Sequence, residues 1–556
     1  MSEVTCGEAV VEMLERAGAE VAFGVLSVHN LPLYDAMARR GRMRTVAATS
    51  ENGALGMADG YARATGRLGV GITSTGVGAA NAAGALLEAY TASSRVLHVT
   101  GQVDSAVVAH DRGALHGARD QLGLLRSISK AAYRVEAAGD AAQLVCRAIE
   151  QVHSERPGPV SIEIPIDLQY ARVQEPPADL APRPPERATP RAEAIAAAVE
   201  GLASAERPLI WAGGGVIAAD ASASLLALAE DIGAGVITTQ AGRGALPESH
   251  PLCIGNFSLE DSVGDLLRDS DVLLAVGTRF RGNETRGWQL SLPRPLVRID
   301  SDPTVLFQNY APDVALLGDA QATLDQLARR LPRQRSANAA WRERVARAGA
   351  AARARWRATL GNHTRLLEDL SSALPEDAIV VRDVTVPATV WGSRLLEVRR
   401  PRAVLHSASM AIGQGLPMAI GAGLAHPKRS VVLLAGDGGF AVSLGEFLVA
   451  VQHQLKLVVV LFNDAGYAIL RNLQDAYFNG RRFGVDLQPY DGARTAGAMG
   501  GWGCRVESAD AFGPALRRAL AQDGPAVLDV DMRAIGPMAV PFTGAARLVP
   551  EQSHAR

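Results

Sequence analysis

The fold class of the chain follows from residues 430–464, which read SVVLLAGDGGFAVSLGEFLVAVQHQLKLVVVLFND. An apolar, β-branched run ends at the Gly-Asp-Gly of 436–438, and a second run, 455–462, ends at Asn463-Asp464. Residues 441–454 between the two runs are helical in character. Two strands joined by one helix of this length predict a βαβ unit with parallel strands.

This unit offers oxygen ligands for a metal. Asp437 and Asn463 would stand at the carboxyl ends of adjacent strands, where open α/β sheets bind ligands. Mg²⁺ prefers such oxygens and completes its coordination with phosphates and water. Gly438 and Gly439 would let backbone N–H groups approach a phosphate, and a helix beginning near Ala441 would add its positive end. Because both turns are also common turn formers, an ordinary pair of turns is the alternative.

The rest of the chain repeats this pattern. With 556 residues, 48% of them hydrophobic, it is long enough for two to four globular domains. The pattern predicts an α/β fold of three consecutive parallel-sheet domains, at 1–173, 191–331 and 362–556. Six prolines between residues 172 and 191 indicate a linker after the first domain. The Ala- and Arg-rich segment 332–361 is expected to be a solvated linking helix.

Charge, cysteines and hydropathy exclude several functions. A net charge of -2 gives no basic field for nucleic acid. The four cysteines form no Cys-x-x-Cys pair, so neither a zinc site nor a disulfide framework is indicated. The N-terminus does not have the pattern of a signal peptide, and no run without charges is long enough to span a membrane. A cytoplasmic protein that binds no membrane is expected.

Several motifs occur in an order that points to one family. ATSENGALGMADGYARATGRLGV (48–70) precedes STGVGAAN (74–81), and SMAIGQGLPMAIGAGLAHP (409–427) precedes the GDG of 436–438 and NDAGY (463–467). The chain resembles the thiamine-diphosphate enzymes of the acetolactate synthase, benzoylformate decarboxylase and benzaldehyde lyase superfamily, with Val77 in place of a proline. The resemblance implies pyrimidine-binding, central Rossmann-like and diphosphate-binding domains, in that order.

Glu51 has the central catalytic role in this resemblance. The corresponding family glutamate bonds N1′ of the aminopyrimidine and favours the imino tautomer, which removes the C2 proton of the thiazolium ring. Glu51 also follows an apolar strand and begins a helix, so the alternative is an acid that only stabilises the helix dipole.

The resemblance also assigns cofactor contacts. Mg²⁺ would be held by Asp437, Asn463 and the carbonyl of Ala465. Ile412 would be the apolar pillar beneath the bent cofactor, and the Met410 carbonyl would accept from the 4′-amino group. The remaining expected contacts to thiamine diphosphate are Thr385, Gly438, Gly439, Gly466 and Tyr467.

Four residues are expected in the substrate pocket. His29 and His116 match active-site positions in the family and can exchange protons near neutral pH, although a lone histidine is often structural. Ile469 and Leu470 resemble the apolar wall of benzoylformate decarboxylase, which suggests a large or apolar 2-oxo acid.

The departures from the family bear on the reaction. Acetolactate synthases carry a lysine where Ile166 stands, and pyruvate decarboxylases have a glutamate in place of Leu470. The implied activity is decarboxylation of a 2-oxo acid, with the enamine protonated to an aldehyde or ligated to a carbonyl acceptor. The alternatives are an acetolactate synthase catalytic subunit, a catalytically silent regulatory homologue, and a nucleotide-binding protein, which would have no use for Glu51.

The resemblance implies an assembly as well. Family sites form between one chain's pyrimidine domain and a partner's diphosphate domain, so a homodimer or homotetramer is expected. The turn AGGGV (212–216) could approach a phosphate, so FAD in the central domain is a further possibility, although such turns also occur in family members whose central domain is empty.

Overall fold

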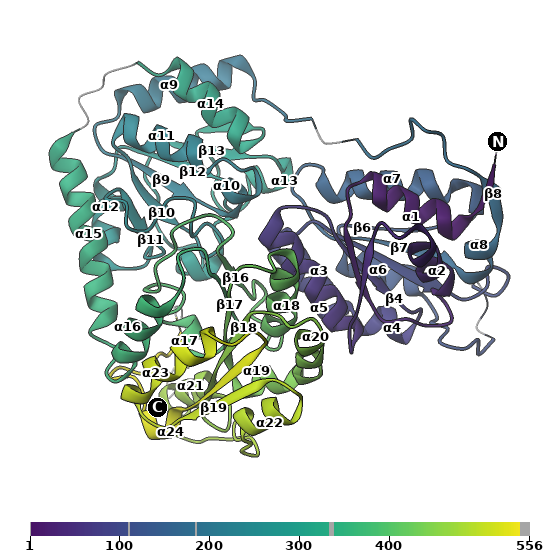
Figure 1. Cartoon of the computed structure of the whole chain (residues 1–556). Coiled ribbons are helices and arrows are strands. Elements are labelled where there is room, and N and C mark those ends of the chain that lie inside the picture. Colours follow the sequence, from purple (N-terminus) through teal and green to yellow (C-terminus); the bar gives the residue numbers. More distant parts are fainter. Residues whose placement is uncertain (1, 109, 111, 184–185, 333–337, 545–556) are drawn as a thin grey trace, which may run out of the picture.

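The computed structural model describes residues 2–108, 110, 112–183, 186–332 and 338–544. Figure 1 shows three α/β units, each built around its own sheet. The predictions that cover residues 1, 333–337 and 545–556 lie outside the described part at those positions. The three consecutive parallel sheets confirm the predicted fold class.

The first sheet is parallel, in the order β3-β2-β4-β5-β7-β6. Its strands are β2 (Val21–Gly24), β3 (Arg44–Ala47), β4 (Gly69–Thr73), β5 (Val96–Gln102), β6 (Ala131–Arg134) and β7 (Val160–Pro165). Its helices are α1 (Cys6–Arg16), α2 (Leu31–Arg40), α3 (Glu51–Thr65), α4 (Val77–Asn81), α5 (Ala83–Ala92), α6 (Gln121–Ile128), α7 (Ala141–His153) and α8 (Ile166–Tyr170). The strands β4, β5 and β7 are buried throughout, as parallel strands covered on both faces must be.

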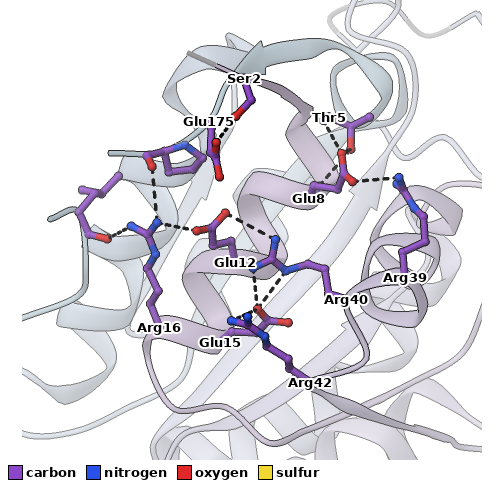
Figure 2. A network of polar contacts seen from close by, with 12 residues as sticks. Ser2, Thr5, Glu8, Glu12, Glu15, Arg16, Arg39, Arg40, Arg42 and Glu175 are labelled. Atoms are coloured by element: carbon purple, nitrogen blue, oxygen red, sulfur yellow. Dashed lines mark hydrogen bonds and ion pairs between the residues drawn. The ribbon is translucent and has the colours of Figure 1, made fainter. Parts of the chain in front are cut away.

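An antiparallel pair and a charged network close the outer face of this domain. The strand β1 (Glu3–Thr5) pairs with β8 (Arg172–Gln174), which joins the first described residues to the end of the domain. Figure 2 shows three glutamates spaced along α1 that face arginines of α1, α2 and the segment after α2. The residues of this network are Glu8, Glu12, Glu15, Arg16, Arg39, Arg40 and Arg42.

The second sheet has the order β11-β10-β9-β12-β13-β14. Counted from its own first strand this is 3-2-1-4-5-6, the order of Rossmann dinucleotide-binding sheets. Its strands are β9 (Pro208–Ala212), β10 (Gly235–Thr238), β11 (Cys253–Gly255), β12 (Val272–Val276), β13 (Leu296–Asp300) and β14 (Val314–Leu317). Its helices are α9 (Ala192–Ser204), α10 (Gly214–Ala218), α11 (Ser222–Ile232), α12 (Asp261–Asp269), α13 (Pro303–Leu306) and α14 (Ala320–Arg330).

The third sheet has the order β16-β15-β17-β18-β20-β19. Counted from its own first strand, it repeats the order of the first sheet, 2-1-3-4-6-5. Its strands are β15 (Ile379–Arg382), β16 (Val404–His406), β17 (Val431–Gly436), β18 (Leu457–Asn463), β19 (Trp502–Val506) and β20 (Ala526–Asp531). Its helices are α16 (His363–Ala373), α17 (Val386–Thr389), α18 (Gly415–Ala425), α19 (Asp437–Val442), α20 (Phe447–Gln452), α21 (Ala468–Tyr477), α22 (Gly492–Ala498), α23 (Ala509–Leu520) and α24 (Met532–Ile535).

The predicted βαβ unit is present, but its helix differs from the prediction. The strands β17 and β18 pair in parallel, with Gly436 opposite Phe462. The single helix expected over 441–454 is wrong, because α19 already begins at Asp437 and a 3-10 turn, Leu444–Glu446, separates it from α20. The Glu446 carboxylate reaches the residues just before α3, where it accepts from the Thr49 N–H (3.1 Å) and the Ser50 hydroxyl (2.8 Å).

Helices α3 and α18 join the first and third domains in the middle of the molecule (Figure 1). Their backbones approach closely at glycines. A Cβ on Gly60 would lie 2.2 Å from the Met418 carbonyl oxygen, and one on Gly421 would lie 2.0 Å from that of Met57. Gly60 of MADGYA and Gly421 of AIGAGL are therefore required by this helix crossing.

The segment after the central sheet forms helix α15 (Ala339–Arg357), which runs along the outer edge of the molecule (Figure 1). The expectation that it is solvated is wrong for one face, since Trp341, Val345 and Ala352 are buried. The Trp341 indole donates to the Pro208 carbonyl at 3.0 Å, which ties the helix to the central domain. Within the described ranges no helix has the length and hydropathy needed to cross a bilayer.

Candidate functional site

Two carboxylates, Asp437 and Asp464, follow the carboxyl ends of β17 and β18. Asp437, the first residue of α19, is 2% exposed, and its Oδ2 accepts from the Gly466 N–H at 3.0 Å. Burial raises the pKa of Asp437, against the effect of that hydrogen bond. Asp464 follows β18, and its pKa is raised to about 7 by burial and then by the charge of Asp437, while Arg471 acts in the opposite direction. Because the charge of Asp437 disfavours ionisation of Asp464, a hard divalent cation beside these carboxylates would favour their charged forms.

Asn463 has other partners. Its amide nitrogen donates to the Tyr490 carbonyl and to Asp529 Oδ1, each at 3.0 Å, and its oxygen accepts from the Ala465 N–H at 3.3 Å. These bonds fix the end of β18 to the neighbouring strand. The Ala465 carbonyl, also expected as a ligand, accepts from Arg471 Nη2 at 2.8 Å, at a residue with φ +56°.

The other expected diphosphate contacts surround Asp437. A Cβ on Gly438 would lie 2.5 Å from the Tyr467 ring, and one on Gly436 would lie 3.2 Å from the Thr385 side chain. Thr385 follows β15, the neighbour of β17 at the point where the strand order reverses. Open α/β sheets bind ligands at this switch point. Among the described residues no group of three or more His, Cys, Asp or Glu side chains could hold a metal; a Mg²⁺ site needs only one or two carboxylates when phosphate supplies other oxygens.

The segment that carries Met410 and Ile412 lies beside α19. A Cβ on Gly413 would lie 2.5 Å from Val442 of that helix. Met410 has φ +64° and is 53% exposed. The buried carboxylate of Asp383 accepts from the N–H groups of Gly413 (3.0 Å) and Gly415 (2.9 Å).

Glu51 is the first residue of α3, after the N-cap Ser50, whose hydroxyl accepts from the Gly53 N–H. The side chain of Asn81 donates to Glu51 Oε2 at 3.2 Å, and a Cβ on Gly78 would lie 2.9 Å from Glu51 Oε1. The loop STGVGAAN therefore lies against the predicted catalytic carboxylate. Glu51 is half-buried, so its carboxylate is accessible from one side.

The two predicted histidines lie together. The ring centroids of His29 and His116 are 5.5 Å apart. Burial lowers the pKa of His29, and the nearby His116 lowers it further. Ser74 connects them to the loop next to Glu51, since its hydroxyl lies 2.8 Å from that of Ser27 and 3.4 Å from His116 Nδ1. The buried Nδ1 of His29 has no hydrogen-bond partner, as expected for a group that meets a ligand.

The two residues of the expected apolar wall, Ile469 and Leu470, differ in their exposure. Ile469 is partly buried and packs on the core of the third domain, whereas Leu470 is 47% exposed. Both begin helix α21, directly after the loop that carries Asp464. Leu470 is thus the more accessible of the two to a substrate or another chain.

The glycines of the central domain are accounted for by packing. A Cβ on Gly213 would lie 2.1 Å from the Gly277 carbonyl oxygen, and one on Gly215 would lie 2.6 Å from the Gly277 Cα. The turn AGGGV must therefore be glycine-rich to pass the turn after β12. FAD binding stays a prediction.

Sequence reasoning missed several carboxylates, three of them near the expected site. Asp464 was read only as part of a turn, although it stands between the expected ligands Asn463 and Ala465. Asp383, after β15, and Glu446, after the GDG motif, hold segments on which the expected site depends. Asp383 follows a strand at the switch point, which is a signal; Glu446 has none, since its partners lie almost 400 residues away.

Comparison with protein families gives three matches along the chain. They are the N-terminal TPP binding domain (residues 4–124), the central domain (195–327) and the C-terminal TPP binding domain (387–530) of thiamine pyrophosphate enzymes. The matches follow the order of the three sheets.

Similar curated proteins cover most of the chain. A probable 2-ketoarginine decarboxylase of Pseudomonas aeruginosa is 36% identical over 87% of this chain and 85% of its own length. A sulfoacetaldehyde acetyltransferase of Castellaniella defragrans is 30% identical, and a probable acetolactate synthase large subunit of Methanocaldococcus jannaschii is 29% identical; each match covers 94% of this chain and 91% of the relative. The family matches show, in agreement with the parallel sheets and the residues gathered at their ends, that the chain belongs to the thiamine pyrophosphate enzyme family.

Proposed function

We propose that this chain is a Mg²⁺- and thiamine-diphosphate-dependent decarboxylase of 2-oxo acids, whose remaining unit is protonated to an aldehyde or ligated to a carbonyl acceptor. The observation that carries the proposal is the pair of carboxylates, Asp437 and Asp464, at the ends of adjacent strands. A Mg²⁺ ion that also binds a diphosphate would offset the negative charge of both carboxylates.

We assign the metal ligands accordingly. Asp437 and Asp464 would bind through their carboxylates, with the Ala465 carbonyl as a further candidate once Arg471 turns away. Asn463, the ligand expected from the sequence, would position the loop through its bonds to Tyr490 and Asp529. Thr385, Gly438, Gly439, Gly466 and Tyr467 would line the diphosphate.

The chain's own residues would orient the cofactor and move protons. Bound thiamine diphosphate supplies a nucleophilic carbon and accepts the electron pair that the departing CO₂ leaves. Glu51 would hold a proton at N1′ of the pyrimidine, with Met410 and Ile412 against the same ring. His29 and His116 would deliver a proton to the product or remove one from it.

The substrate proposal draws on the relatives. One of them is named as a probable 2-ketoarginine decarboxylase, so a 2-oxo acid with a long, cationic side chain is the first to test. The exposed Leu470 would contact the aliphatic part of such a chain.

We also propose a homodimer or homotetramer with composite sites, acting in the cytoplasm. Large apolar side chains are exposed beside both halves of the expected site: Leu26, Val28, Val77 and Leu115 in the first domain, and Met410, Val442 and Leu470 in the third. Such patches are typical of surfaces covered by another subunit.

Release of CO₂ tests the proposal. The purified protein with Mg²⁺ and thiamine diphosphate should release CO₂ from 5-guanidino-2-oxopentanoate or another acid in a panel with pyruvate and benzoylformate. The Glu51→Gln variant should lose turnover but still bind thiamine diphosphate, measured by calorimetry. Near-normal turnover of this variant would contradict the role of Glu51, and no CO₂ from any acid despite cofactor binding would favour a silent homologue.

Acetolactate synthesis is the second candidate, because relatives named as acetolactate synthases match nearly the whole chain. Its products distinguish it. Both reactions release CO₂ from pyruvate, so the organic product decides: acetolactate in that case, and an aldehyde in the first.

A further inference from the structure

The segment 407–413 connects β16 to α18 and carries Met410 at its exposed apex. The Ser407 hydroxyl donates to the Ala411 carbonyl at 2.8 Å, which closes the segment on itself. It has few backbone bonds to its own sheet, where the Ser407 N–H donates to the Arg382 carbonyl at 3.2 Å. Most of the remaining hydrogen bonds to the segment come from the first and central domains.

The first domain holds this segment through Glu88 of α5. Glu88 Oε1 accepts from the Ala408 N–H at 2.6 Å, and Oε2 accepts from the Ser409 N–H at 2.9 Å. The Ser409 hydroxyl also donates to Oε2, and the Ser407 hydroxyl, whose proton is directed to the Ala411 carbonyl, lies 3.3 Å from it. The Ala408 and Ser409 groups are all donors, so they require an acceptor that carries no hydrogen of its own.

Arg63 of α3 keeps this buried carboxylate charged. Its Nη2 donates to Glu88 Oε1, and its Nη1 donates to the His406 carbonyl, each at 2.7 Å. Its Nε donates to Asp59 at 2.9 Å. The Glu88 side chain is 1% exposed, so an unpaired charge here would be costly.

The central domain adds a third contact to the same short segment. Arg281 Nη1 donates to the Ala408 carbonyl at 2.9 Å. Asp383 holds the following glycines, Gly413 and Gly415, from the third domain. The segment is therefore fixed at both ends by buried carboxylates, and only its apex, with Met410, is open.

We infer that Glu88 is a positioning residue: it holds residues 407–409 from another domain and so sets where Met410 and Ile412 stand. That these two residues meet the pyrimidine of thiamine diphosphate rests on the proposed function. The hydrogen bonds from residues 408 and 409 to Glu88 are present in the chain without cofactor, so they can be tested separately.

The test compares Glu88→Gln with Asp59→Asn, without and with thiamine diphosphate. Glu88→Gln preserves size but places an N–H among donors. Asp59→Asn disturbs the same charged cluster, but Asp59 accepts from Arg63 and not from the segment. In the protein without cofactor, we expect hydrogen exchange of peptides covering 404–415 to be at least about tenfold faster in Glu88→Gln than in Asp59→Asn. We also expect Glu88→Gln alone to weaken calorimetric thiamine diphosphate binding, at saturating Mg²⁺, by about tenfold.

Each outcome decides the inference. Unchanged exchange in Glu88→Gln, or equal acceleration in both variants, would overturn it. Faster exchange with unchanged cofactor affinity would also overturn it, since Glu88 would then only join domains. If Glu88→Gln does not fold, Ser409→Ala, which removes one donor to Glu88, should show the same changes at smaller size, and no change there would count against the inference. If the wild-type protein binds no thiamine diphosphate, the proposed function fails, and the exchange data still decide whether Glu88 holds the segment.

Discussion

Asp464 and Asn463 are adjacent residues with different surroundings. The Asp464 carboxylate lies in the field of Asp437, whereas the Asn463 amide bonds to Tyr490 and Asp529. A one-residue shift at the end of a strand turns a side chain to the opposite face of the sheet, which separates the two roles.

Substitution of the two residues should separate these roles. Asp464→Ala should weaken Mg²⁺-dependent binding of thiamine diphosphate by more than about tenfold, because a ligand is lost. Asn463→Ala should instead destabilise the protein by about 1–3 kcal/mol, because Asp529 Oδ1 loses its donor. Calorimetric titration and thermal unfolding measure the two effects. The opposite result, with Mg²⁺ dependence lost only in Asn463→Ala, would restore Asn463 as the ligand.

A buried histidine in the first sheet predicts a pH dependence of stability. Burial lowers the pKa of His98 to about 3, and its ring bonds to Thr73 (2.9 Å) and Ser161 (3.1 Å). The unfolded chain takes up this proton near pH 6.5, so folding loses stability as the pH falls from there toward 3.

His98→Gln should therefore remove part of the loss of stability in acid. The wild type should lose on the order of 2 kcal/mol through this residue between pH 7 and pH 5, and the variant should not. Urea unfolding followed at the two pH values measures the difference. Equal losses in both proteins would show that His98 is not buried in the neutral form.

At the scale of elements, the crossing of α3 and α18 determines how the first domain meets the third. Gly60 and Gly421 allow backbone contact, and α3 begins with Glu51 while α18 follows the Met410 segment. The position of this crossing therefore affects both halves of the expected site.

A pair of glycine substitutions tests this crossing. Gly60→Ala should destabilise the protein by about 1–3 kcal/mol, because its Cβ would lie 2.2 Å from the Met418 carbonyl oxygen. Gly264→Ala is the matched control: it lies within α12 with no atom near the added Cβ, so it should stabilise by about 0.5–1 kcal/mol. Thermal unfolding compares the two. A Gly60→Ala protein as stable as the wild type would mean that the helices are not in backbone contact.

At the scale of the whole molecule, the expected site is divided between domains. Glu51 belongs to the first domain and Asp437 to the third, and the exposed apolar surfaces beside them predict that a second copy covers each.

Mixing two inactive variants tests this division. Glu51→Gln and Asp437→Ala should each be inactive, but together they should regain about a quarter of wild-type activity in a dimer. Random exchange makes about half of the dimers mixed, each with one intact site of two. Subunit exchange would be followed by native mass spectrometry. Mixed dimers without activity would contradict a composite site.

The sequence by itself determined the fold class and the motif residues. Buried parallel strands read as continuous apolar runs, and glycine-rich turns mark their ends, so β17, β18 and the turn at Asp437 could be recognised locally. Glu51, His29 and His116 were predicted as site residues from the family resemblance; the structure brings the two histidines together, and the catalytic roles stay predictions.

Only the tertiary structure decided which of Asn463 and Asp464 lies in the field of Asp437, where helix 437–452 breaks, and which face of α15 is buried. It also revealed Glu88, Glu446 and Asp383, whose roles depend on contacts between separate strands, helices and domains. The physical reason is that periodicity records a residue's immediate environment along the chain. The hydrogen bonds of a buried carboxylate are satisfied by donors that folding brings from elsewhere, and no local pattern specifies them.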